Sequence, residues 1–131
     1  MEVRIEYPVD GVATVAIRGQ LDIDTAPTLE AAFDELLTRA ANRIVVDLTR
    51  LDFCDSIGLS TLVVAYHHCV RTGGWLRLAG PTPFLKRLLV VVGIADTVPM
   101  YRTADGARTG DPAELITDHK DAELSLESKL R

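Results

Sequence analysis

The chain has 131 residues and a mass of 14.3 kDa, which is enough for one domain with its own hydrophobic core. Its composition is that of a globular protein, with 47% hydrophobic and 25% charged residues, and its longest apolar run is too short to cross a bilayer. The net charge of −5 and the lack of a basic run argue against a partner that is a nucleic acid or an anionic membrane surface.

The first elements in chain order are two strands and a helix. Residues 3–7 and 12–17 alternate in polarity, as half-buried strands do. Asp10-Gly11 between them suits a tight hairpin turn, so the two strands are expected to be antiparallel neighbours. Apolar residues at helical spacing then predict an amphipathic helix over residues 26–41, with Thr25 as its N-cap.

The next elements alternate between strand and helix. Residues 44–48 form a β-branched run typical of a strand in the centre of a sheet. Helices are predicted over residues 57–70 and 82–92, with a strand at 75–79 between them and a short last strand at 98–102. The order β-β-α-β-α-β-α, closed by that short strand, predicts an α/β fold with a mixed four- to five-stranded sheet and helices packed against it.

The strands joined through helices should be parallel, so their carboxyl ends should share one edge of the sheet. The loop after the second strand holds Asp22 and Asp24, and the loop after the third holds Asp52 and Asp55. Since α/β folds commonly place their sites at this edge, we expect the functional site there.

The last part of the chain has a different character. Residues 1–103 should form the folded domain, with ten basic and twelve acidic residues, whereas residues 104–131 carry four basic and seven acidic residues. Glycine and proline interrupt the beginning of this acidic tail, and its apolar content is low. We therefore expect a tail that is frayed or ordered by a partner, with some helix at most.

The segment Asp55–Leu59 combines a strand end, a polar pair and a helix start. Asp55 or Ser56 could simply cap the helix by accepting its free backbone N–H groups. The same position would also suit a phosphorylated Ser56, because a helix N-terminus favours negative charge. Such a phosphate would meet the nearby acids and change the surface sharply, as a switch requires.

Other chemistry has weaker support in the sequence. Asp22 and Asp24 resemble the start of a D-x-D motif that binds magnesium, but the further acids and the lysine of such phosphatases are not recognisable. The run His67–Cys69 cannot converge on one metal ion, because successive helical residues point about 100° apart. The sequence also has no Walker A motif and no nucleophile elbow.

The cysteines and the N-terminus bear on the cellular compartment. Cys54 and Cys69 are too few for a disulfide framework and are expected to be small buried residues, at a strand end and near a helix end. No signal peptide is visible at the N-terminus. The sequence therefore predicts a cytoplasmic protein, with no membrane insertion.

The chain resembles the STAS domains, and in particular the bacterial anti-sigma-factor antagonists. No single motif is decisive, but the order and spacing of several motifs across about residues 3–103 carry the resemblance, and the expected fold agrees with that of the family. The matching stretches are 19–22 (GQLD), 44–48 with 51–53 (IVVDL and LDF), 55–59 (DSIGL), and 93–96 leading into 98–101 (GIAD and VPMY).

The resemblance implies a protein-binding switch rather than an enzyme, with no catalytic residues, metal or cofactor of its own. Such antagonists bind an anti-sigma factor that is itself a serine kinase and binds ATP, and so free a sigma factor. The kinase phosphorylates the antagonist, and a serine phosphatase resets it. By position, the resemblance places the partner-binding surface at Gly19, Leu21, Asp22, Asp24, Asp55, Ser56, Ile57 and Gly58.

One position departs from the family pattern. The usual phosphate acceptor is the second hydroxyl residue of the motif, and here that residue is Ile57. Either Ser56 accepts the phosphate, or the domain is not switched by phosphorylation and stays competent to bind. Three alternatives stay open: a STAS subunit of a transporter or signalling complex, a phosphohydrolase that uses Asp22 and Asp24, and a nucleotide-binding signalling module.

Overall fold

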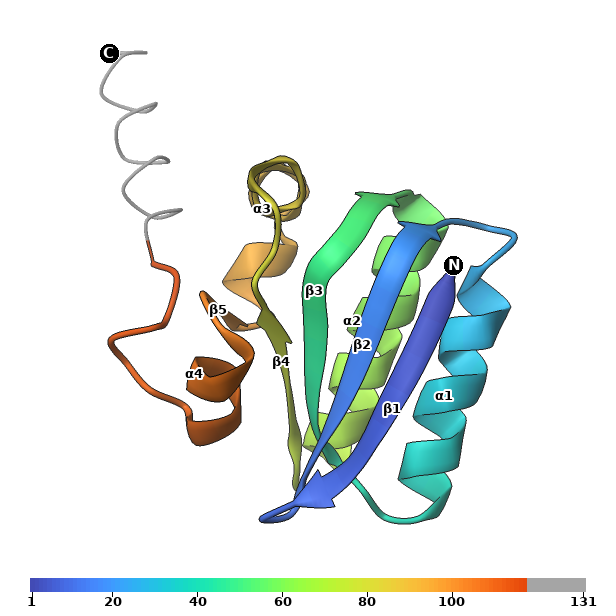
Figure 1. The fold of residues 1–131 in the computed structure, drawn as a ribbon, viewed down its shortest axis with the longest axis vertical. Coiled ribbons are helices and arrows are strands. Elements are labelled where there is room, and N and C mark those ends of the chain that lie inside the picture. Colours follow the sequence, from blue (N-terminus) through green and yellow to red (C-terminus); the bar gives the residue numbers. More distant parts are fainter. Residues whose placement is uncertain (118–131) are drawn as a thin grey trace.

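The computed structural model describes residues 1–117, which form a five-stranded sheet with helices on both faces (Figure 1). Within these residues no helix combines the length and the apolar character needed to span a membrane. The elements in chain order are β1 (Glu2–Val9), β2 (Val12–Leu21), α1 (Ala26–Thr38), β3 (Arg43–Cys54), α2 (Ser56–Arg71), β4 (Trp75–Ala79), α3 (Pro83–Val91), the 3-10 turn η1 (Ile94–Asp96), β5 (Met100–Tyr101) and α4 (Ala104–Thr109).

The sheet has the strand order β1-β2-β3-β4-β5, so each strand lies beside its neighbours in the chain. β1 pairs with β2 in the antiparallel sense, around the turn at Asp10-Gly11. The pairs β2–β3, β3–β4 and β4–β5 are all parallel. This confirms the predicted mixed sheet. It also brings the carboxyl ends of β2 and β3 to one edge, where Leu21 lies opposite Cys54.

The second and third strands are longer than their hydrophobic patterns predict. β2 extends to Leu21 and β3 has twelve residues, although the apolar run that predicts β3 ends at Leu48. The added part of β3 contains the exposed residues Asp52 and Phe53 and pairs with the end of β2 through two register irregularities. Its strand structure therefore depends on pairing, which a local pattern does not reveal.

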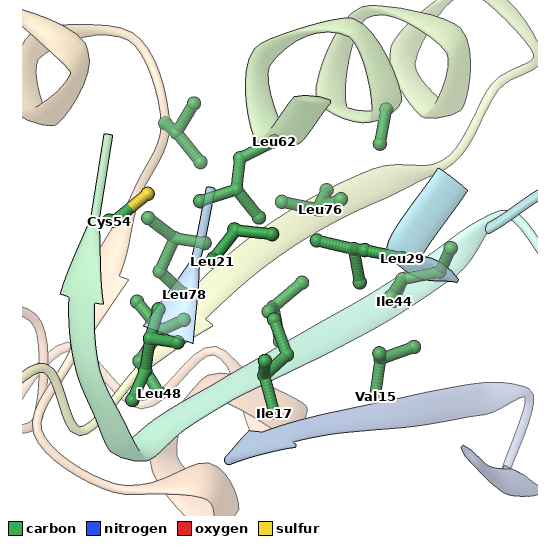
Figure 2. Packing of buried hydrophobic residues seen from close by; sticks show 14 of the residues in the cluster. Val15, Ile17, Leu21, Leu29, Ile44, Leu48, Cys54, Leu62, Leu76 and Leu78 are labelled. Atoms are coloured by element: carbon green, nitrogen blue, oxygen red, sulfur yellow. The ribbon is translucent and has the colours of Figure 1, made fainter. Parts of the chain in front are cut away.

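The main core lies between the sheet and helices α1 and α2, which stand behind the sheet in Figure 1. Figure 2 shows Leu62 of α2 directed toward Leu21 and Leu76 of the sheet, and all three side chains are at most 1% exposed. Leu85 and Leu89 of α3 belong to the same cluster. Side chains of α1, α2 and α3 thus share one continuous core, although Phe84 and Val92, predicted to face inward with Leu85 and Leu89, are exposed.

A second, smaller core lies on the opposite face of the sheet. Val45 and Ala79 point to that face, and Ala107 of α4 covers them together with Tyr101. Arg77 strengthens the contact, since its guanidinium lies 3.8 Å from the centre of the Trp75 ring and donates a hydrogen bond of 2.9 Å to the Ala107 carbonyl. α4 is therefore held by a hydrogen bond and by apolar contact, and the stacking on Trp75 fixes the position of the Arg77 donor.

This packing corrects the expectation of a frayed tail for the part that the structure describes. Residues 104–117 include a short helix, and the Ile116 side chain is only 5% exposed within the main core. The Ile116 N–H also donates to the Met100 carbonyl at 2.8 Å. The remainder of the predicted tail, residues 118–131, lies outside the described residues, as does His119.

Candidate functional site

The loops after β2 and β3 lie together at one edge of the sheet. The Asp55 N–H donates a hydrogen bond of 3.0 Å to the carbonyl of Leu21, which ties the start of α2 to the end of β2. The loop that carries Asp22, Asp24 and Thr25 begins directly after Leu21, the last residue of β2. The predicted convergence of these two loops is therefore present in the structure.

Asp55 both caps α2 and joins the two loops. Its Oδ1 accepts the N–H of Gly58 at 2.8 Å, which is the capping bond that the sequence predicts for this segment. Its Oδ2 accepts the N–H of Ile23 at 3.0 Å, across 32 positions of the chain. Since both carboxylate oxygens are used, Asp55 acts as a positioning residue for the loop after β2.

Asp22 organises the start of α1. Its Oδ1 accepts the N–H groups of Asp24 and Thr25, each at 3.0 Å, and its backbone carbonyl accepts the N–H of Ala26 at 2.8 Å. These bonds satisfy backbone groups that the beginning of a helix would otherwise leave free. Asp22 thus has a structural role that accounts for its carboxylate without a metal ion.

Thr25 does not cap α1 in the predicted way. It occupies the N-cap position, but its backbone is already helical and its side chain makes no capping bond. Its Oγ1 instead accepts the N–H of Asp22 at 2.8 Å and donates to the Gln20 carbonyl at 2.9 Å. The hydroxyl therefore stabilises the loop, and the capping bonds come from Asp22.

Three of the residues that the family resemblance assigns to partner binding have little or no free surface. Gly58 is buried, and a methyl group added to it would lie 2.6 Å from Cγ of Leu21 and 2.9 Å from Sγ of Cys54. Leu21 is fully buried, and Gly19 is half-buried with a φ of +102°. A glycine is therefore needed at position 58 for α2 to pack closely against β2. The three residues support the two loops from the protein interior.

The solvent-facing part of this edge is formed by Ile23, Asp24, Ser56 and Ile57, which we call the loop surface. The Ile23 side chain is 64% exposed and that of Ile57 is 44% exposed. Asp24, Ser56 and Ile57 were expected here, whereas Ile23 was not. An isoleucine within an otherwise polar loop is the sequence signal that could have identified it.

The structure lends no support to metal chemistry at the other candidate residues. Within residues 1–117, no group of three or more His, Cys, Asp or Glu side chains is arranged to hold a metal ion. His67 and His68 are exposed on α2 whereas Cys69 is buried, so the three side chains diverge as the helical geometry predicts.

Cys54 and Cys69 are buried free thiols. Burial raises the pKa of Cys54 to about 12, and the neighbouring Asp55 carboxylate adds to this effect. Burial likewise raises the pKa of Cys69 to about 11. Neither thiol has the low pKa and access to solvent that a reactive cysteine needs, in agreement with the predicted packing role.

Comparison with known proteins agrees with this geometry. The family model described as "STAS domain" matches residues 6–107. An anti-sigma F factor antagonist from Paenibacillus polymyxa is 31% identical over 100 residues, which covers 76% of this chain and 86% of that protein. The anti-sigma-F factor antagonist RsfB from Mycobacterium tuberculosis is 28% identical over 101 residues, covering 77% and 82% of the two chains.

A solved structure is similar as well. The crystal structure of an anti-sigma factor antagonist from Mycobacterium paratuberculosis superposes with a TM-score of 0.75 at 30% identity, covering 83% of this chain and 92% of that one. The sheet, the two loops at its edge and the match over residues 6–107 lead to one conclusion. The chain belongs to the STAS domain family.

Proposed function

We propose that this protein is an anti-sigma factor antagonist, which binds an anti-sigma factor and thereby frees a sigma factor for transcription. The observation that carries the proposal is the exposed loop surface, built on the DSIG segment and positioned by Asp55. The family and the names of the similar proteins support the same function.

The loop surface has the composition of a protein interface. Ile23 and Ile57 offer apolar side chains beside the Asp24 carboxylate and the Ser56 hydroxyl. The carboxylates of Asp22 and Asp55 hold the loop in place by accepting backbone N–H groups. Complete burial of an isoleucine is worth roughly 1.5–3 kcal/mol. A partner could still bury the exposed 64% of Ile23 and 44% of Ile57, which would contribute part of that value at each residue. A positioned loop also loses less conformational entropy when it binds.

The partner in this proposal is an anti-sigma factor that is a serine kinase and supplies the bound ATP, with a serine phosphatase to reverse the modification. Such a partner acts in the cytoplasm, and the proposal places this protein there. The antagonist itself contributes a binding surface and a substrate hydroxyl, and no catalysis.

Ser56 is the proposed phosphate acceptor. It is exposed at the first position of α2, directly after the N-cap residue Asp55, whereas Ile57 has no hydroxyl group. A phosphate on Ser56 would add about −1.5 to −2 charges next to the apolar side chain of Ile57. The partner would have to remove water from that charge, which would weaken binding and release the antagonist.

The test begins with the full chain immobilised and exposed to an extract of its native cells, with and without Mg-ATP. We expect recovery of an ATPase-type anti-sigma factor and an added phosphate in the intact mass of the chain after treatment with ATP. The purified anti-sigma factor should then release its sigma factor when the chain is added. Absence of release, or recovery of transporter subunits in its place, would contradict the proposal.

Variants at Ser56 test the switch separately. Ser56→Asp should weaken binding of the purified anti-sigma factor, whereas Ser56→Ala should bind normally and gain no phosphate. If the chain releases sigma factor but never gains phosphate, it is an antagonist without this switch. The isoleucine at position 57, where the family usually has the acceptor hydroxyl, would then explain the missing phosphate.

A further inference from the structure

A groove with a volume of 390 Å³ separates α1 from α2. Each helix contributes one stripe of its surface to the walls, since the lining residues recur at intervals of three and four positions along α1 and along α2. Most of its exposed lining is apolar surface, which comes from Phe33 and Leu37 of α1 with Ile57, Val64 and Ala65 of α2. Two hydroxyl side chains of α2, Ser60 and Thr61, also line the groove.

Two exposed aliphatic side chains border this groove. Ile57 lies near the start of α2 and Val64 two turns further along, with exposed fractions of 44% and 64%. Thr61 between them is buried, and its hydroxyl already donates a hydrogen bond of 3.1 Å to the Ile57 carbonyl. The groove therefore presents mainly apolar surface that nothing within residues 1–117 covers.

The rim along α1 is acidic. Glu30 and Asp34 line the groove one helical turn apart, and no lysine or arginine among residues 1–117 lines it. Among the described residues neither carboxylate takes part in an ion pair. His68 of α2 also lines the groove. Apolar walls beside two unpaired carboxylates match a ligand that is both apolar and cationic.

The groove also continues the loop surface, because Ile57 belongs to both. The residue that departs from the family pattern is thus the one that joins the two surfaces. A hydroxyl side chain at this position would interrupt the apolar surface, whereas isoleucine extends it from Ile23 toward Val64.

We infer that the groove between α1 and α2 receives an amphipathic helix of the anti-sigma factor, whose apolar face lies against Ile57 and Val64 and whose Lys or Arg side chains pair with Glu30 and Asp34. The inference rests on the function proposed above for the identity of this partner. An apolar groove beside a charged rim is a common receptor for a helix of opposite charge.

A peptide experiment tests the groove without the natural partner. The probe is a synthetic amphipathic helix with leucines at helical spacing flanked by arginines, and the control peptide carries glutamates in place of the arginines. Methyl NMR signals of Ile57 and Val64 should shift with the arginine peptide only. Val91, which is 76% exposed on α3, is the control position and should not shift.

Absence of shifts at Val64, equal shifts with both peptides, or equal shifts at Val91 would overturn the inference. Since this measurement uses no anti-sigma factor, it remains valid if the proposed function fails. Shifts at the groove in a protein that releases no sigma factor would refute the antagonist function and retain the groove.

Binding of the purified anti-sigma factor tests the same surface in its proposed context. The double variant Glu30→Lys/Asp34→Lys should weaken binding about tenfold and reduce its dependence on salt. Val64→Asp should weaken it by a similar factor. The matched controls are Glu6→Lys on β1 and Val91→Asp on α3, which should stay within about twofold.

If the anti-sigma factor binds the wild type and all four variants equally, the groove inference is wrong and the proposed function stands. Circular dichroism and thermal unfolding of each variant would establish that it is folded before its affinity is compared. Glu30, Asp34 and Val64 are all exposed on helix surfaces, where substitutions usually change stability little.

Discussion

At the scale of single residues, the two oxygens of the Asp55 carboxylate have separate tasks. Oδ1 caps α2 through Gly58, and Oδ2 holds the loop after β2 through Ile23. Asparagine can still accept the first bond but cannot accept the second, whereas alanine can accept neither. Substitutions at this position can therefore separate the stability of α2 from the position of the loop surface.

We expect Asp55→Ala to lower the free energy of unfolding by about 1–3 kcal/mol, because a capping bond and a second hydrogen bond are lost. Asp55→Asn should cost less and mainly accelerate hydrogen exchange of the Ile23 amide. Chemical denaturation and exchange measured by NMR provide the two readouts. Asp52→Ala, an exposed neighbouring acid, is the control, and an equal loss in that variant would argue against the assigned role.

The two thiols make a prediction about alkaline pH. Burial raises the pKa of Cys54 to about 12 and that of Cys69 to about 11, from an ordinary value of 9.0. The unfolded chain therefore releases these protons at lower pH than the folded chain does. Their contribution to stability is complete below pH 9 and is lost as the pH rises from about 9 toward 12.

Unfolding experiments across this pH range should thus show a decrease in stability that is smaller in the variant Cys54→Ala/Cys69→Ala. The comparison with this variant is needed because the hydrogen bond to Glu35 also raises the pKa of Tyr7. Identical alkaline slopes in the two proteins would contradict the prediction. At about pH 8, a thiol reagent should modify the native protein slowly and the denatured protein rapidly.

At the scale of elements, α4 depends on Arg77 for its place on the sheet. The guanidinium stacks on Trp75 and donates to the Ala107 carbonyl, so both planarity and donor geometry matter. Arg77→Lys retains the positive charge but loses the stacking, and we expect it to cost about 1–2 kcal/mol. Hydrogen exchange in α4 and the fluorescence of Trp75, the single tryptophan, should both change.

The control for this substitution is Arg87→Lys, an exposed position on α3 that should leave α4 and the fluorescence unchanged. If Arg77→Lys leaves hydrogen exchange in α4 as it is in the wild type, then apolar contact through Ala107 is sufficient to hold the helix.

At the scale of the whole molecule, residues 104–117 complete both cores. A chain that ends at residue 103 would expose Val45 and Ala79 on one face and lose Ile116 from the other. We expect it to be less stable than a chain that ends at 117 by about 3 kcal/mol or more. Thermal unfolding of the two chains measures the difference.

If the shorter chain fails to fold, the variant Ile116→Ala within the chain ending at 117 measures part of the same effect. It should lose about 2–4 kcal/mol, because the side chain is buried in the main core. A loss below about 0.5 kcal/mol would show that this segment contributes little.

The fold could be predicted from sequence because its signals are local. The alternation of β1 and β2, the turn at Asp10-Gly11 and the helical spacing of α2 each lie within one short window. α4 was missed because it has only six residues and few apolar ones. Its position depends on Arg77 of β4, which lies 30 positions before Ala107 and becomes its neighbour only once the sheet has formed.

The candidate site shows the same limit. The edge of the sheet follows from parallel strands, and the cap at Asp55 follows from the residue type at a helix start. The bond from Ile23 to Asp55 depends on the register of β2 against β3, which contains two irregularities that no local pattern encodes. The burial of Gly58 against Leu21 and Cys54 depends on the same register.

The strand order β1-β2-β3-β4-β5 bears on how the protein folds during synthesis. Each strand that leaves the ribosome finds its pairing partner already present, so the sheet can grow from the N-terminus by simple addition. No early strand has to wait for a later one to be inserted beside it. The β3–β4 face is the exception, because Val45 and Ala79 stay uncovered until α4 has been synthesised. A nascent chain paused before residue 104 would therefore present an apolar sheet surface to chaperones.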